Sequence, residues 1–295
     1  MPDGKGKKHV MGASVQEYPE DALPSTKHSY SRTDGRRFQV RGAGYEKTGV
    51  KVQSDSVMAE IIAVDLFKTD HKLCHIMKYI EIPEEYRIPH PLSDSKNFIP
   101  QLFVINFMIP AYSPSNPIWG TSKTDGKSYS AVLYIRLKPE TIDLMKDDSS
   151  NAAKLLNRFF QMDCTSEEDF ALRGRLKGIP ILLNPQCIGL GVALRQLIKK
   201  FDAKPFLTGP KYHSFIKTDH YLECDIDIHQ WIYIARKTLH SLIGEIHKMD
   251  LDFGVVVEAA DEEAPERMLA SIRVSQIDPE QAVHISVGGH HPCNK

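Results

Sequence analysis

Two stretches, Leu102-Phe-Val-Ile-Asn-Phe-Met-Ile109 and Tyr129-Ser-Ala-Val-Leu-Tyr-Ile-Arg-Leu137, decide the fold class that we expect for this sequence. Both are rich in β-branched and aromatic residues, which fit the pleated surface of a sheet. A Pro-rich segment, residues 110–117, and the turn Lys123-Thr-Asp-Gly126 separate them. This spacing predicts two antiparallel neighbouring strands joined by a loop.

Further strands and helices surround this pair. The same composition predicts strands at Phe38–Arg41, Met58–Phe67, Leu251–Glu258 and Leu269–Val274. Apolar spacing predicts helices at Asn151–Gln161, Gly191–Phe201 and His229–His247. Strands that cluster between helices, without regular βαβ alternation, indicate an α+β fold. We therefore expect a curved antiparallel sheet with a long C-terminal helix packed on it.

The composition is that of an ordinary globular chain. Of 295 residues, 41% are hydrophobic and 25% are charged, so the chain can bury a core. Lys plus Arg total 37 and Asp plus Glu total 38, which gives a net charge of −1. Proteins that bind nucleic-acid phosphates need a basic excess, so we expect no nucleic-acid partner. No apolar run approaches the ~20 residues that span a bilayer, and no secretory signal is present, so we expect a cytoplasmic protein without a transmembrane segment.

The ends of the chain differ in composition from its middle. Residues 1–35 are rich in Gly, Pro, Ser, Lys and Asp without sustained periodicity, and residues 279–295 look equally loose. Between them we find neither a low-complexity linker nor an internal repeat. The sequence therefore predicts a flexible leader (1–35), one domain (36–278) and a flexible tail (279–295).

The segment Tyr221-Leu-Glu-Cys-Asp-Ile-Asp227 combines a strand pattern with three carboxylates. Strand alternation places the apolar residues on one face and Tyr221, Glu223, Asp225 and Asp227 on the other. Carboxylates about 6.5 Å apart repel each other unless cations lie opposite them. One interpretation is a strand salt-bridged to Arg173, Arg175 and Lys177, with Asp227 capping the next helix. The functional alternatives are a hard-cation site or a paired-carboxylate acid/base centre.

Positive charge gathers near the start of the predicted domain, in Arg36-Arg-Phe-Gln-Val-Arg41 with Lys47 and Lys51. One interpretation is a basic lip for anionic lipid headgroups, at ~1 kcal/mol per cation near a charged membrane. The other is a solvated edge strand that its charges protect from pairing with another chain.

No complete catalytic or metal-binding motif is present. Gly120 to Ser128 resembles a phosphate-binding loop, but a predicted strand follows it where that loop needs a helix. His71, Cys74 and His75 would share a helix face as zinc ligands, yet a fourth ligand is missing. The five cysteines are odd in number and include no CxxC pair, so we expect reduced thiols. We expect neither a cofactor nor a metal.

An ordered set of short segments resembles the plant Enhanced Disease Resistance 2 C-terminal domain family. The segments are Phe38-Gln-Val-Arg-Gly-Ala-Gly-Tyr45 with Lys51, Ala63–Asp70, Leu102–Pro110, Ala131–Tyr134, Arg175–Pro180, Pro205–Lys211, Tyr221–Asp227 and Ala264-Pro-Glu266. Departures include Ala264, where the family usually has Leu, and Thr208, where it often has Leu. In plant proteins this domain follows a phosphoinositide-binding pleckstrin-homology domain and a lipid-binding START domain. The resemblance therefore implies a membrane-associated role and supplies no catalytic residues.

The leading hypothesis is a non-enzymatic module that binds lipid or a membrane-associated protein, at the membrane periphery. A START-like arrangement around an internal cavity is an interpretation by shape. Candidate ligand contacts are Arg36, Arg37, Arg41, Tyr45 and Lys51 at the lip and Arg175, Lys177, Tyr221, Glu223 and Asp225 on a polar face of the core. Two alternatives stay open: a metal-dependent or acid/base enzyme using Glu223, Asp225 and Asp227, and a structural subunit that binds partner proteins.

Overall fold

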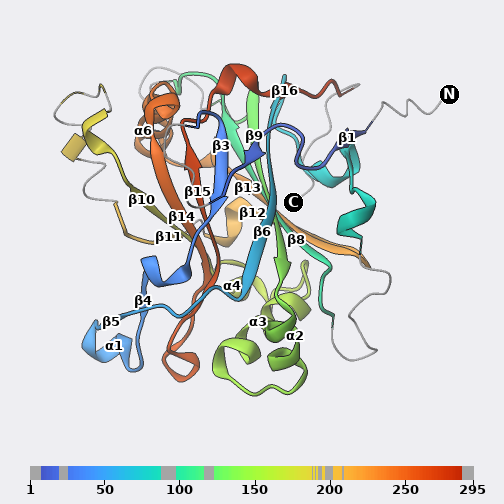
Figure 1. Ribbon diagram of the computed structural model, residues 1–295, viewed down its shortest axis with the longest axis vertical. Helices are drawn as coiled ribbons and strands as arrows, with labels where there is room; N and C mark the ends of the chain where they lie inside the picture. Colours follow the sequence, from blue (N-terminus) through green and yellow to red (C-terminus); the bar gives the residue numbers. More distant parts are fainter. Residues whose placement is uncertain are drawn as a thin grey trace.

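The computed structural model contains two six-stranded sheets with short helices around them (Figure 1). It describes residues 8–19, 26–87, 98–115, 123–187, 202–207 and 209–287, with the single positions 189, 191, 195 and 196. Sheet I has the order β11 (Phe206–Leu207), β10 (Leu176–Leu182), β14 (Asp250–Val257), β15 (Met268–Ser275), β3 (Ser29–Arg32) and β2 (Gln16–Glu17). Sheet II has the order β12 (His213–Lys217), β13 (Tyr221–Asp227), β8 (Leu102–Pro110), β9 (Ser128–Leu137), β6 (Ala59–Thr69) and β16 (Val283–His284).

Two small strand pairs and the helices complete the described elements. The pairs are β4 (Gln39–Arg41) with β5 (Lys51–Gln53), and β1 (His9–Val10) with β7 (Ile80–Glu81). The α-helices are α1 (Tyr45–Thr48), α2 (Pro139–Lys146), α3 (Asn151–Gln161), α4 (Phe170–Arg173) and α6 (Tyr233–Ile243). Among the described residues, no helix combines the length and apolar character needed to cross a bilayer.

The α+β class is confirmed, and the predicted strands lie close to the observed ones. The predicted bounds of α3 agree with the structure, because the Ser150 side chain accepts a hydrogen bond from the Ala153 amide at 3.2 Å and fixes the helix start. The sheet arrangement differs from the single antiparallel sheet that we expected. The described residues form two six-stranded sheets, and sheet II includes two parallel pairs, β13 with β8 and β16 with β6. A crossover that brings distant strands together leaves no local trace in sequence.

The C-terminal helix is shorter than the predicted stretch His229–His247. The chain first forms a 3₁₀ turn, η6 (Ile228–Gln230), because the Asp227 side chain accepts the His229 amide at 3.1 Å. Helix α6 then covers 11 residues and ends at Gly244, where glycine weakens a helix. Strands β14 and β15 follow it in the chain. The long-helix and START-like parts of the expected fold are therefore not confirmed.

The main core lies between the two sheets and receives side chains from both. Phe103 of β8 packs edge-on against Phe159 and Phe160 of α3, with ring centroids 5.9 and 5.7 Å apart. Val255 and Leu269 approach the same cluster from sheet I. A second cluster covers the opposite face of sheet II, and a third lies beneath the β4–β5 hairpin. Both faces of sheet II are therefore buried.

Some described residues within the predicted leader and tail form strands. Strand β3 lies inside the expected leader, yet it pairs with β15 and buries Tyr30 in the core. Strand β16 lies inside the expected tail and pairs with β6, followed by the buried Ile285. Short strands of two to four residues are too brief for a periodic signal, so sequence patterns cannot detect them. The predicted helix Gly191–Phe201 lies mostly outside the described residues.

Candidate binding pocket

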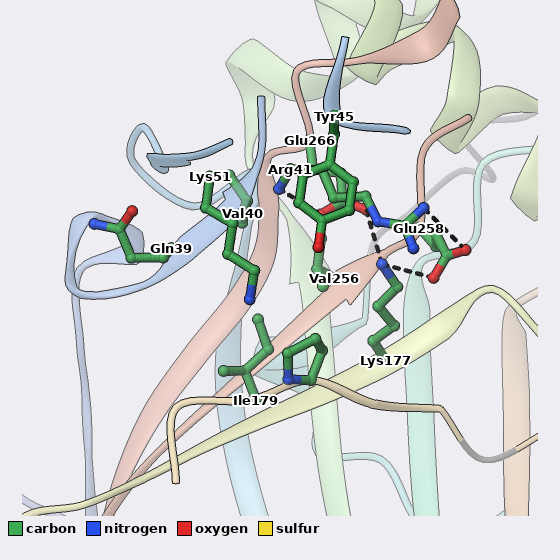
Figure 2. Close-up of a pocket in the computed structure, with 11 residues that line it drawn as sticks. Gln39, Val40, Arg41, Tyr45, Lys51, Lys177, Ile179, Val256, Glu258 and Glu266 are labelled. Carbon is green, nitrogen blue, oxygen red and sulfur yellow. Dashed lines mark hydrogen bonds and ion pairs between the residues drawn. The ribbon is translucent and has the colours of Figure 1, made fainter. Parts of the chain in front are cut away.

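A pocket of about 240 Å³ opens where the β4–β5 hairpin lies against sheet I. Figure 2 shows the hairpin residues Arg41, Tyr45 and Lys51 on one side and Lys177 and Ile179 of β10 on the other. The pocket is thus formed by segments that lie more than a hundred residues apart in the sequence.

The hairpin is fixed in place by apolar residues at its base. Phe38 and Val40 are buried with Ile179, Val256 and Met268 against the outer face of sheet I. Together they hold one end of the hairpin against the sheet.

Two glycines shape the far end of the hairpin. Gly44 and Gly49 flank the single turn α1 and adopt left-handed backbone angles, φ 67° and 64°, which side chains disfavour. The base is therefore anchored, while the far end projects from the sheets (Figure 1).

A network of four charges forms one wall of the pocket. The Lys177 ammonium lies 2.7 Å from Glu258 Oε2 and 2.9 Å from Glu266 Oε1, and its side chain is only 3% exposed. The Arg41 guanidinium lies 3.1 Å from the second oxygen of Glu258. Glu266 also accepts the backbone amides of Arg41 and Ala259, at 2.9 and 3.1 Å. Two cations and two carboxylates therefore balance within the wall.

Lys51 adds a further cation to this balanced wall. It lies directly opposite Arg41 in the hairpin, a like-charge pair that is unfavourable by itself. The Arg41 guanidinium also lies over the Tyr45 ring, 5.0 Å from its centroid. Within the described part of the chain, Lys51 makes no ion pair. The pocket therefore presents one net positive charge beside an aromatic ring.

The structure brings together four of the predicted contact residues, Arg41, Tyr45, Lys51 and Lys177, and places the other basic ones elsewhere. Arg36 is exposed and pairs with Asp34 at 3.2 Å. Arg37 contacts the buried Asp252, which Arg273 also contacts. Arg175 pairs with Glu263 at 2.6 Å. These three arginines make ion pairs outside the pocket.

Glu258 and Glu266 are the charged pocket residues that the sequence patterns did not predict as contacts. Glu266 belongs to the segment Ala264-Pro-Glu266, and Glu258 ends a predicted strand. Their role could have been suspected from one signal: a lysine inside an apolar strand, Lys177, must have buried acidic partners.

Strand β13, which we call the acidic strand, belongs to sheet II, and its side chains Glu223, Asp225 and Asp227 lie on the face opposite the main core, away from the pocket. Its predicted face alternation is confirmed, since Leu222, Cys224 and Ile226 enter the main core. The expected cationic partners are wrong, because Lys177 belongs to sheet I. The strand instead meets residues 72–80, which we call the covering segment.

Backbone amides of the covering segment donate hydrogen bonds to the two central carboxylates. Glu223 Oε1 accepts the Ile76 amide at 2.6 Å, and Asp225 Oδ2 accepts the His75 amide at 2.8 Å. The Asn106 side-chain amide donates to the other oxygen of Asp225 at 2.7 Å. Asp227 has a lysine partner, Lys72, whose ammonium lies 2.7 Å from its carboxylate.

Burial determines the ionisation of this cluster. Burial raises the pKa of Glu223 well above its ordinary value, and the charge of Asp225 raises it further. Burial also raises the pKa of Asp225 to about 6 and that of Tyr221 to about 12. The pKa of His75, whose Nε2 lies 2.7 Å from the Tyr221 hydroxyl, is lowered by burial to about 4.

The geometry of the strand bears on the enzyme alternative. Glu223 and Asp225 are fully buried beneath the covering segment. Acid/base chemistry on a substrate would therefore require that segment to move away.

The zinc-ligand hypothesis for His71, Cys74 and His75 rested on a helix that does not form. The turn η2 (Ile76–Tyr79) begins only after His75, which has a left-handed φ of 55°. Cys74 is disulfide-bonded, so the expectation of reduced thiols is wrong there, while Cys164, Cys187 and Cys224 are free. Over the ranges that the structure describes, no group of three His, Cys, Asp or Glu residues is placed to hold a metal.

Comparison with known proteins gives one family. The model described as "Protein ENHANCED DISEASE RESISTANCE 2, C-terminal" matches residues 30–278. A curated relative, "Protein ENHANCED DISEASE RESISTANCE 2-like" from Arabidopsis thaliana, is 24% identical over 265 residues. The match covers 89% of this chain and 30% of the relative, so the chain spans about a third of that protein's length. No solved structure matches the chain.

Proposed function

This chain belongs to the ENHANCED DISEASE RESISTANCE 2 C-terminal family, and we propose from that premise that it is a non-enzymatic module whose pocket binds the anionic headgroup of a membrane lipid. The observation that carries this proposal is Lys51, which makes no ion pair with any described residue and lies beside the balanced network of Arg41, Lys177, Glu258 and Glu266. A single excess cation in a partly apolar pocket suits one phosphate or carboxylate group.

The size of the pocket supports a headgroup rather than a whole lipid. Pockets that enclose drug-sized ligands measure about 300–1,000 Å³. This one, at about 240 Å³, has room for a headgroup, and the acyl chains would stay in the bilayer. The pocket therefore suits binding at the membrane periphery and does not suit the carriage of a whole lipid inside the protein.

Lys51→Gln tests the proposal because it removes the excess cation and breaks no ion pair. We expect about fivefold weaker binding to anionic vesicles, since one cation near a charged membrane contributes ~1 kcal/mol. The measurement is co-sedimentation with phosphatidylcholine vesicles, with and without phosphatidylserine. Lys154→Gln, an exposed lysine on α3, makes the same change of charge away from the pocket and serves as the control.

A soluble probe separates the pocket from general attraction to a surface. Glycerol phosphate should raise the melting temperature of the wild type and of Lys154→Gln, because a ligand that binds only the native state stabilises it. It should raise that of Lys51→Gln much less. If Lys51→Gln and Lys154→Gln bound vesicles equally and showed equal melting-temperature shifts with glycerol phosphate, the pocket would not be the headgroup site.

A further inference from the structure

We infer that the far end of the hairpin contacts the lipid bilayer itself, with the exposed side chain of Val50 entering the headgroup region. We call residues 44–52 the hairpin tip. This inference rests on the proposed function, since it says how the bilayer lies when a headgroup enters the pocket. It depends on Val50, which does not line the pocket, and can therefore fail separately.

Exposed apolar side chains mark the hairpin tip. Val50 is 54% exposed and Val52 38% exposed, and both rank among the few large hydrophobic side chains that face solvent within the described ranges. In Figure 1 the hairpin and α1 stand away from both sheets at the lower left. An apolar side chain on a projecting element gains free energy when it leaves water for a bilayer interface.

The backbone groups of Val50 are already hydrogen-bonded within the protein. The Val50 amide donates to Thr48 Oγ1 at 3.2 Å, and the Val50 carbonyl accepts the Gly42 amide at 3.1 Å. The Gly49 amide donates to the Tyr45 carbonyl at 2.7 Å. Because unpaired backbone groups are costly in an apolar medium, it matters that Val50 can enter the interface with both of its own backbone groups already paired.

The hairpin also ties the tip to the pocket. Arg41, Tyr45 and Lys51 line the pocket, and the same short hairpin carries Val50. A lipid whose headgroup occupies the pocket must keep its acyl chains in the bilayer, which then lies at the mouth of the pocket and beside the tip. This continuity selects a lipid surface as the partner of the tip.

The charges at the tip sharpen the inference. Lys47 and Lys51 favour an anionic surface, whereas Glu46 is exposed on α1 and its amide contacts Asp261 at 3.1 Å. Two lysines and one glutamate leave a net charge of +1 at the tip, and the neighbouring Asp261 offsets it, so general electrostatic attraction is weak here and the apolar side chain must contribute. The exposed Glu46 should then weaken binding to an anionic bilayer.

Val50→Asp tests the inference against a matched control. We expect at least about tenfold weaker binding to phosphatidylserine-containing vesicles, because the apolar transfer is lost and a charge is added. Val10→Asp makes the same substitution at a valine that is 49% exposed on β1, at the other side of the molecule in Figure 1. That control should bind vesicles as the wild type does.

Glu46→Lys supplies the opposite sign and should strengthen vesicle binding about fivefold or more, since it removes an anion and adds a cation at the surface. All variants should keep the wild-type melting temperature without lipid, which shows that they fold.

Glycerol phosphate separates the two proposals. If Val50→Asp binds vesicles more weakly but glycerol phosphate still raises its melting temperature, the tip contacts the bilayer and the pocket binds the headgroup. Equal vesicle binding by Val50→Asp and Val10→Asp overturns the inference and leaves the pocket proposal standing. If Val50→Asp binds vesicles more weakly and glycerol phosphate does not raise the melting temperature even of the wild type, the result supports bilayer contact by the tip and overturns headgroup binding by the pocket.

Discussion

Replacing Lys177 by Met is expected to lower the free energy of unfolding by about 3–5 kcal/mol. The substitution keeps the apolar stem of the side chain and removes the ammonium that lies between Glu258 and Glu266. Glu266 is 3% exposed, so its carboxylate would be left buried with only Arg41, at 3.9 Å, as a charged partner. Urea unfolding of the wild type and the variant at neutral pH measures the difference.

Two further variants show whether the loss comes from an unpaired charge. Adding Glu266→Gln to Lys177→Met should recover about 1–3 kcal/mol, because the double variant removes both charges and Gln still accepts a backbone amide. Lys154→Met on the exposed surface of α3 should change the free energy of unfolding by less than about 0.5 kcal/mol. A similarly small loss for Lys177→Met would contradict a buried network.

The pocket shows why its residue types could be predicted and its assembly could not. Arg41, Tyr45 and Lys51 stand close together in the sequence, so local charge patterning singled them out. Glu266 lies 225 positions from Arg41, and nothing local indicates that they bond. Ion pairs formed through sheet topology depend on which strands become neighbours, and that is decided by the packing of the whole core.

In the acidic strand, the sequence pattern predicts which side chains share a face but not the partners of its carboxylates. Period-two alternation fixed which side chains share a face, and the structure confirms it. The alternation pattern predicts cationic side chains as partners, because a row of carboxylates needs positive charge or hydrogen-bond donors opposite it. The observed partners of Glu223 and Asp225 are backbone amides of residues 147 and 150 positions away. Backbone donors are the same at every non-proline position, so the sequence carries no sign of them.

The free energy of unfolding should fall as the pH rises through the range in which Glu223 and Asp225 titrate. The folded-state pKa of both Glu223 and Asp225 lies above the ordinary value, so the folded protein holds more protons than the unfolded chain in that range. The contribution of the pair is therefore most favourable below about pH 4, the unfolded value, and declines as pH rises through about 6 for Asp225 and higher for Glu223. Other groups act oppositely. Burial lowers the pKa of His75, His213 and His229 to about 4. The contribution of these histidines to the free energy of unfolding therefore decreases as the pH falls below about 6.5.

Glu223→Gln isolates the contribution of the pair, because His213 and His229 are common to both proteins. The amide oxygen can still accept the Ile76 amide, and the amide nitrogen can donate to Asp225. We expect the variant to be more stable than the wild type by about 2 kcal/mol at mildly alkaline pH and nearly equal near pH 5, since one unit of pKa corresponds to about 1.4 kcal/mol. Urea unfolding from about pH 5 to 9 gives the two curves.

Glu223→Leu separates the charge from the hydrogen bond. This variant also removes the ionisation, but it leaves the buried Ile76 amide without its acceptor, which costs about 1–3 kcal/mol at every pH. Its stability curve should therefore be as flat as that of Glu223→Gln and lie below it throughout. If both variants instead declined with pH as steeply as the wild type, Glu223 would be ionised in the folded protein over the whole range. That result would contradict the raised pKa that we attribute to the burial of Glu223 beside Asp225.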